Sequence, residues 1–334
     1  MPVDTIAEVQ PIRIAKEQPS FVITPFLEDI INRSLLYLKA GFPINFSSPA
    51  GMGKTTIAMY VAAQLAQPVI LIHGDEEFVT SDLVGGQHGY RKKKTVDNFI
   101  HSVLKTDEKV SSAWIDNRLT VACKHGFTLV YDEFTRSRAE ANNVLLGVLE
   151  ERILDLPAAR GEDAYLKVHS NFRAIFTSNP EEYAAVYKAQ DALLDRMISI
   201  GLTHYDWQTE LAITKAKSGI SETDAGRIVD MVRELRQEHI GGSGPTIRAS
   251  IMLAKILKLC KQNESRNTFA RACVDILDTE TRRRMEGQES RKDLKEIVPE
   301  LIDKYFNVSA TDEEEAGVTD VKKISVTDEE EILV

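Results

Sequence analysis

A glycine-containing turn between an apolar run and a helical pattern constrains this chain more than any other feature. The apolar run ends at residue 47, the turn follows it, and a helical pattern covers residues 57–65. A strand, a tight loop and a helix in that order point backbone N–H groups and the positive end of a helix dipole at a phosphate. The turn therefore predicts nucleotide binding by nine consecutive residues: Ser48, Pro49, Ala50, Gly51, Met52, Gly53, Lys54, Thr55 and Thr56.

The turn matches the phosphate-binding pattern G-x-x-x-x-G-K-[ST] except at its first position, where Ser48 replaces glycine. Lys54 is expected to reach the β- and γ-phosphates, and Thr55 is expected to place its hydroxyl on Mg²⁺. Gly-Lys-Thr alone is a weak signal, so the prediction depends on the residues downstream.

Two further apolar stretches end in the residue types that hydrolysis of a nucleotide needs. Residues 127–131 are followed by Asp132 and Glu133, and residues 172–178 are followed by Asn179. Ligands bind at the carboxyl ends of strands in open α/β sheets. We therefore expect Asp132 to hold Mg²⁺ directly or through water, Glu133 to polarise the attacking water, and Asn179 to orient it. Together the three strand ends predict an α/β phosphate-binding NTPase core.

Composition and charge limit the classes of protein that this chain can be. Its 334 residues, 43% of them hydrophobic, leave room for two domains, and no apolar run is long enough to span a bilayer. Residues 1–20 lack the apolar segment of a signal peptide, which predicts a cytoplasmic protein. Residues 311–334 hold nine acidic residues against two lysines and account for −7 of the net charge of −10. The remainder is near balance, which argues against a general nucleic-acid binder, and the tail is expected to be disordered or to dock on a basic partner.

The cysteines and histidines give no site. Cys123, Cys260 and Cys273 are odd in number and widely spaced, which fits neither a disulfide framework nor a zinc site. We expect all three to be buried small hydrophobic residues. The seven histidines show no metal-ligand spacing.

The remaining pattern predicts the order of the elements along the chain. A polar segment around residues 82–94 contains several glycines and the basic run 91–94, and is expected to be a mobile loop. Beyond residue 207 the pattern is helical, with a break at 241–245. Before that point we expect helices at 26–39, 139–152 and 189–196, further strands at 69–72 and 197–200, and a hairpin from 153–156 and 165–168.

Over roughly residues 21–305 the chain resembles an AAA+ ATPase of the MoxR-like group. Walker A corresponds to 48–55 and Walker B to 128–133, with sensor 1 at Asn179. Residues 190–196 are similar to the arginine-finger motif, ending in Arg196, and residues 242–249 resemble sensor 2, with Arg248. The polar segment and the 153–168 hairpin resemble the helix-2 and pre-sensor-1 insertions of that group.

This resemblance implies an AAA+ P-loop NTPase with a five-stranded parallel αβα core and a C-terminal helical lid domain. It implies ATP and Mg²⁺ as ligands and a homo-oligomer, expected to be a hexameric ring, in which Arg196 completes the site of a neighbouring subunit. Arg248 would report the nucleotide state to the lid. The expected parts are an N-terminal extension (1–20), the ATPase core (21–203), the helical lid (204–307) and the acidic tail (308–334).

Several longer runs narrow the resemblance to the gas vesicle protein N (GvpN) family. Membership implies ATP-driven remodelling or chaperoning of the hydrophobic shell protein of gas vesicles, with shell and accessory proteins as partners and a cytoplasmic, partly vesicle-associated location. The runs that carry this resemblance are 21–25, 73–78, 81–85, 89–94, 97–106 and 177–183.

Two departures and three alternatives stay open at this stage. Ser48 requires a loop entry that tolerates a Cβ, and Thr135, where related proteins often carry Asn, leaves the roles of Arg136 and Arg138 open. The main alternative is a MoxR-type ATPase that activates or remodels a metalloenzyme or another large complex. A non-hydrolysing shell or adaptor protein is disfavoured by Glu133, Asn179 and Arg196. A small-molecule kinase or GTPase is disfavoured by the adjacent Asp132 and Glu133 and by the separate helical domain.

Overall fold

The computed structural model of the chain describes residues 10–14, 21–97, 105–157, 164–180, 191–238, 244–262, 266–282 and 294–306. The acidic tail and most of the N-terminal extension therefore lie outside the described residues. Within the described ranges, no helix has the length and apolar character needed to cross a membrane.

The centre of the molecule is a five-stranded parallel sheet. Its strands lie in the order β2-β5-β8-β1-β9, and each neighbouring pair is parallel. The sheet confirms the expected α/β fold with a five-stranded parallel core. Its strands are β1 (Ile44–Ser47), β2 (Val69–His73), β5 (Thr128–Asp132), β8 (Arg173–Ser178) and β9 (Ile198–Gly201).

Both faces of the sheet are covered, which explains why its strands are apolar runs. One face packs against α1 (Pro25–Lys39) and α2 (Lys54–Gln64), and the other against α3 (Thr80–Val84) and α4 (Arg118–His125). Successive residues of β5 alternate between the faces, because Val130 belongs to the first core while Leu129 and Tyr131 belong to the second. The helices leave the carboxyl edge of the sheet uncovered, and residues 48, 132 and 179 lie together at this edge, at the ends of β1, β5 and β8.

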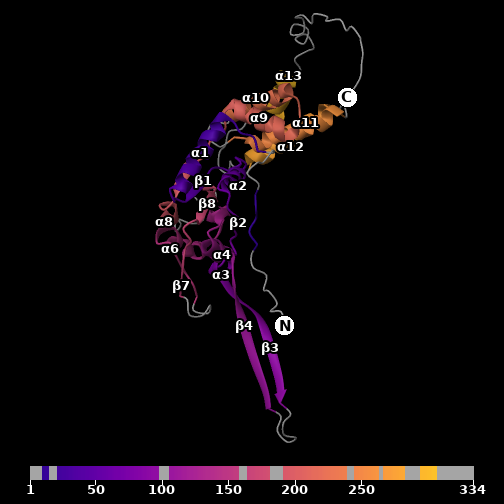
Figure 1. The fold of residues 1–334 in the computed structure, drawn as a ribbon. Helices are drawn as coiled ribbons and strands as arrows, with labels where there is room; N and C mark the ends of the chain where they lie inside the picture. Colours follow the sequence, from indigo (N-terminus) through magenta and orange to yellow (C-terminus); the bar gives the residue numbers. More distant parts are fainter. Residues whose placement is uncertain are drawn as a thin grey trace, which may run out of the picture.

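Most of the polar segment after β2 is one strand of a long antiparallel hairpin, so the expectation of a loop there is wrong. β3 (Gly85–Asp97) pairs with β4 (Lys105–Asp116) along their whole lengths. Figure 1 shows this hairpin projecting from the sheet, away from the helices at the C-terminal side of the fold. In a two-stranded ribbon the backbone groups that face the partner strand are paired and the outward groups can bond to water, so the ribbon needs no buried face and no alternating apolar residues. Gly85 is required at its base, where φ is 131° and a Cβ would lie 2.3 Å from the Ile115 carbonyl oxygen.

The prediction of one continuous helix over residues 139–152 is also wrong. It is divided into α5 (Ala139–Asn142) and α6 (Val144–Glu150), which follow the 3₁₀ turn η1 (Phe134–Arg136). The side chain of Asn142 is fully buried, donates to the Phe134 carbonyl oxygen at 3.0 Å, and is bonded to the Tyr131 hydroxyl. These bonds tie the end of α5 to the turn. The hairpin expected after it is confirmed as β6 (Ile153–Asp155) and β7 (Tyr165–Lys167).

The remaining described elements, α8 to α13, are helices, and α9 to α13 lie in the segment expected to form the helical lid. Four of them, α10–α13, enclose a third apolar core of their own. Cys123 and Cys273 are buried as expected, but Cys260 is only partly buried, at the edge of this third core. The helices are α8 (Asp191–Leu194), α9 (Trp207–Ser218), α10 (Glu222–Glu238), α11 (Ile247–Gln262), α12 (Arg266–Arg282) and α13 (Leu294–Phe306).

Candidate functional site

The loop between β1 and α2, called the P-loop from here on (residues 48–53), lies at the carboxyl edge of the sheet. Gly53 is the N-cap of α2 in the left-handed region (φ 81°), and Gly51 has a φ of 89°. A Cβ on Gly51 would lie 2.4 Å from Thr246 Oγ1, so only glycine fits there. Ser48 is buried, and its hydroxyl donates to the Pro49 carbonyl oxygen at 3.1 Å, which shows that the loop entry accommodates a Cβ.

Lys54 places a buried positive charge inside the P-loop. Its side chain is 7% exposed, and its Nζ donates to the carbonyl oxygens of Ser48 at 2.6 Å and Pro49 at 3.0 Å. A lysine this well buried needs hydrogen-bond partners, and the loop supplies them. The loop is thus folded around an ammonium group at the N-terminus of α2, where an anion is favoured.

Asp132 lies beside two hydroxyls. Its Oδ1 accepts from Thr55 Oγ1 and from Thr177 Oγ1, each at 2.6 Å, and its Oδ2 lies 3.4 Å from His73 Nδ1. A carboxylate and a hydroxyl in contact are the hard oxygen ligands that Mg²⁺ prefers. The residues present therefore fit a magnesium ion between α2 and β5.

Glu133 follows Asp132 in a left-handed backbone conformation, with a φ of 52°. Its N–H donates to Thr177 Oγ1 at 2.8 Å, and its carboxylate is 2.8 Å from Arg136 Nη1. Gly74 makes this conformation possible, because a Cβ there would lie 2.0 Å from the Glu133 carbonyl oxygen. A non-glycine residue at such a φ costs about 1–3 kcal/mol and persists only where its surroundings hold it.

Asn179 lies directly after β8 and is 5% exposed. Because β8 pairs with β5 on one side and β1 on the other, Asn179 shares an edge with Asp132 and the P-loop. The structure therefore brings the predicted residues of three strand ends to one place. Thr177, two residues earlier, was missed by the sequence reasoning, since a threonine inside a β-prone run carries no chemical signal of its own.

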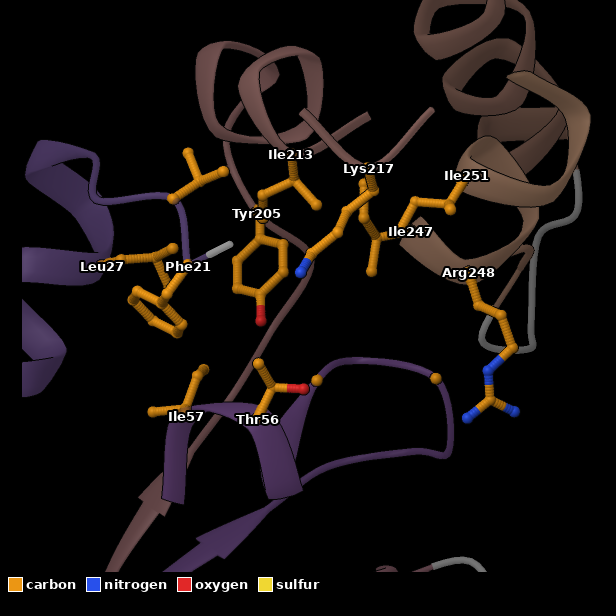
Figure 2. A pocket seen from close by; sticks show the side chains of 13 residues that line it. Phe21, Leu27, Thr56, Ile57, Tyr205, Ile213, Lys217, Ile247, Arg248 and Ile251 are labelled. Atoms are coloured by element: carbon orange, nitrogen blue, oxygen red, sulfur yellow. The ribbon is translucent and has the colours of Figure 1, made fainter. Parts of the chain in front are cut away.

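An apolar cavity of about 170 Å³ adjoins the P-loop, and sequence reasoning missed most of its lining. Figure 2 shows Tyr205 near its centre, with the amine of Lys217 directed toward it. The Tyr205 hydroxyl donates to the Met52 carbonyl oxygen of the P-loop, and burial, with the Glu210 carboxylate nearby, raises the pKa of this hydroxyl so that it stays neutral. The cavity is lined by Phe21, Val22, Leu27, Gly51, Gly53, Thr56, Ile57, Tyr205, Ile213, Lys217, Ile247, Arg248 and Ile251. A planar apolar group attached to a phosphate chain fits such a space.

The two predicted arginines lie in different places. Arg248, at the start of α11, lines the cavity beside the P-loop (Figure 2). Arg196 follows α8, and its guanidinium contacts Glu150 of α6 at 2.6 Å and the Ala192 carbonyl oxygen at 2.6 Å. Arg248 thus lines the cavity of its own chain, whereas Arg196 is held by α6 and α8.

Comparisons with known proteins agree with this geometry. The profile of the AAA domain (dynein-related subfamily) matches residues 49–197. The chain is 50% identical over 266 residues to the gas vesicle ATPase GvpN of Ancylobacter aquaticus, covering 79% of this chain and 74% of that protein. It is 40% identical over 286 residues to the gas vesicle ATPase GvpN of Haloferax mediterranei, covering 85% and 81%.

A more distant likeness extends beyond those proteins. The protein CbbQ of Hydrogenophilus thermoluteolus is 23% identical over 202 residues, covering 60% of this chain and 67% of that protein. The match to the AAA domain and the identity with the two gas vesicle ATPases establish that this chain is a nucleotide-binding AAA+ ATPase.

Proposed function

Because the chain belongs to the family of gas vesicle ATPases GvpN, we propose that it uses ATP hydrolysis to remodel or chaperone the hydrophobic shell protein while gas vesicles assemble. The single observation that best supports a hydrolysing enzyme is the cluster around Asp132. A metal-binding carboxylate, the Thr55 hydroxyl and Glu133 are held within one hydrogen-bonded group at the end of β5. A chain that used nucleotide only to hold its fold would not need Glu133 fixed in a strained conformation.

The proposed roles follow from charge and position. Phosphoryl transfer needs positioning and charge neutralisation more than covalent chemistry. Lys54 neutralises the β- and γ-phosphates of ATP, and Thr55 with Asp132 would hold Mg²⁺, which would supply positive charge to offset that of the phosphates. Glu133 accepts a proton from the attacking water, and Asn179 orients that water.

The base of the nucleotide occupies the apolar cavity under this proposal. Tyr205 and Ile247 belong to the same apolar core as helix α2, which supports a cavity wall packed directly against the helix that follows the P-loop. The P-loop and the first three residues of α2, together residues 48–56, then cradle the phosphates, with Gly51 and Gly53 allowing close backbone approach.

We also propose the assembly that the resemblance implies. The parts are the ATPase core (21–203) and the helical lid (204–307), and the subunits form a homo-oligomer, expected to be a hexameric ring. Arg196 releases Glu150 and completes the site of a neighbouring subunit, while Arg248 couples the nucleotide to the lid. An arginine supplied in this way is worth about 10³–10⁵ in rate in well-studied NTPases.

The client-binding element of this proposal is the β3–β4 hairpin. Its strand β3 carries Tyr90 and the four consecutive cations 91–94, and the hairpin projects from the sheet (Figure 1). A projecting ribbon can grip a partner protein while the ATPase core changes state. Shell and accessory proteins of the gas vesicle are the proposed partners, and the location is cytoplasmic and partly vesicle-associated.

The proposal is tested in cells that carry the other gas-vesicle genes but lack this one. The wild-type chain should restore vesicles in electron micrographs, and Lys54→Ala at an equal protein level should not. Vesicles restored equally by Lys54→Ala would refute ATP-driven remodelling. Normal vesicles without the chain, together with loss of activity of a metalloenzyme or another large complex, would support the MoxR-type alternative instead.

A further inference from the structure

A buried carboxylate lies where the helices meet the sheet. Glu210, in the first turn of α9, is 1% exposed. One of its oxygens accepts from Arg233 Nη1 at 3.0 Å, and the other accepts from Arg236 Nη1 at 2.9 Å. Both arginines belong to α10. Two guanidinium partners satisfy the carboxylate, and a buried charge of this kind is tolerated only when it is so paired.

Each of these arginines also holds a backbone carbonyl of another segment. Arg233 Nη1 donates to the Tyr205 carbonyl oxygen at 3.2 Å, and Arg236 Nε donates to the Pro245 carbonyl oxygen at 3.0 Å. Tyr205 lies just before α9, and Pro245 lies just before α11. Glu210 therefore fixes the two guanidiniums that fasten these segments to α10.

Both fastened segments contact the P-loop. The Tyr205 hydroxyl donates to the Met52 carbonyl oxygen, and its ring lines the cavity. Thr246 and Arg248, directly after Pro245, pack on Gly51, since a Cβ placed there would lie 2.4 Å from Thr246 Oγ1 and 3.5 Å from Arg248 Cβ. Two walls of the cavity, at Tyr205 and after Pro245, therefore contact the P-loop, and both are held by arginines that the Glu210 carboxylate fixes.

We propose that Glu210 is a positioning residue for nucleotide binding, which sets both walls of the cavity against the P-loop through Arg233 and Arg236. Glu210 does not touch the nucleotide in this proposal. The inference rests on the proposed function, because it takes the cavity to be the site of the base. If Glu210 only stabilised the helices, its removal would lower the melting temperature without changing the nucleotide affinity of the folded protein.

The test compares Glu210→Gln with Glu222→Gln as a matched control. Glu222 also bridges α9 and α10, because Lys215 Nζ lies 2.7 Å from its carboxylate, but it is exposed and has no link to the P-loop. The dissociation constant of a fluorescent ATP analogue is measured by titration, KM and kcat for ATP by steady-state kinetics, and the melting temperature with and without ATP. All binding and rate measurements are made well below the melting temperature of each variant.

Glu210→Gln should raise the dissociation constant and KM by about tenfold or more, since charge-assisted bonds of this kind are among the strong ones. At saturating ATP its kcat should change far less, and the rise in melting temperature on adding ATP should shrink. Glu222→Gln should leave all of these values at the wild-type level. A lower melting temperature for Glu210→Gln with unchanged affinity and an unchanged ATP-induced shift would overturn the proposal.

A double-mutant cycle measures whether Glu210 and Tyr205 act on nucleotide affinity together, which a purely structural role of Glu210 does not predict. Tyr205→Phe removes the hydroxyl bond to Met52, and Glu210→Gln with Tyr205→Phe should raise the dissociation constant by less than the product of the single effects. If Glu210→Gln does not fold, Arg236→Lys replaces it, because a lysine has a single nitrogen and cannot reproduce the separate Nη1 bond to Glu210 and Nε bond to Pro245. Unchanged affinity in that variant overturns the proposal. Failure of the wild-type chain to bind ATP would instead overturn the proposed function.

Discussion

Replacing Thr177 by valine removes the hydroxyl that connects the two carboxylate residues of the site. Valine has nearly the same shape as threonine, so the fully buried position keeps its packing. The variant loses the bond to Asp132 Oδ1 at 2.6 Å and the bond from the Glu133 N–H at 2.8 Å. Thr177→Ser is the matched control, because serine keeps the hydroxyl and loses only a methyl group.

The size of the effect follows from the two bonds. A hydrogen bond to a charged group contributes about 1.5–3 kcal/mol and one between neutral groups about 1 kcal/mol, so Thr177→Val should destabilise the protein by roughly 2.5–4 kcal/mol. Thr177→Ser should cost only about 1 kcal/mol, the value of one buried methyl group. Glu133 also loses the bond that holds its strained backbone, so kcat of Thr177→Val should fall by about tenfold or more, with a smaller change in KM.

Urea unfolding gives the stabilities, and steady-state ATPase assays give kcat and KM for the three proteins. The expected order of stability and of kcat is wild type, then Thr177→Ser, then Thr177→Val. The reasoning is refuted if Thr177→Val unfolds and turns over ATP like Thr177→Ser, because the hydroxyl would then hold neither carboxylate residue in place.

Two further predictions concern the assembly and the client. Arg196→Ala should keep its affinity for ATP but lose most hydrolysis, and mixing it with Glu133→Gln subunits should restore some activity; no recovery despite verified co-assembly contradicts supply of the arginine in trans. Tyr90→Ala combined with Lys92→Ala and Lys93→Ala should keep basal ATPase activity but impair vesicle formation in cells. Normal number and width of vesicles would favour a solvated hairpin, and a parallel loss of ATPase activity would show that the hairpin supports the ring.

The sheet and its strand ends could be predicted from the sequence because the central strands β1, β5 and β8 are buried on both faces. An apolar run that ends in a carboxylate or a turn then corresponds directly to a buried strand and its carboxyl end. This holds for β5, which ends at Asp132, and for the strand and turn that precede Lys54. The β3–β4 hairpin could not be predicted in this way, because a two-stranded ribbon needs no buried face and leaves no alternating pattern.

The parts of the site that act through contacts between distant segments were also hidden in the sequence. Thr177 bonds to Asp132 and Glu133 across separations of 45 and 44 residues, and Tyr205 bonds to Met52 across 153 residues. Such partners are set by the packing of the sheet and of α9, and no local spacing reports them. Glu210 reads in the sequence as an ordinary acidic residue in a first helical turn, and only its burial shows otherwise.

The most direct test of the central claim is a comparison of ATP binding and ATP turnover in Glu133→Gln. This variant removes the proposed proton acceptor but keeps Lys54, Thr55 and Asp132, so ATP and Mg²⁺ should bind with near wild-type affinity while turnover nearly disappears. Lys54→Ala, measured beside it, should lose binding itself. Wild-type turnover by Glu133→Gln, or unchanged ATP affinity of Lys54→Ala, would contradict the proposed assignment of the site.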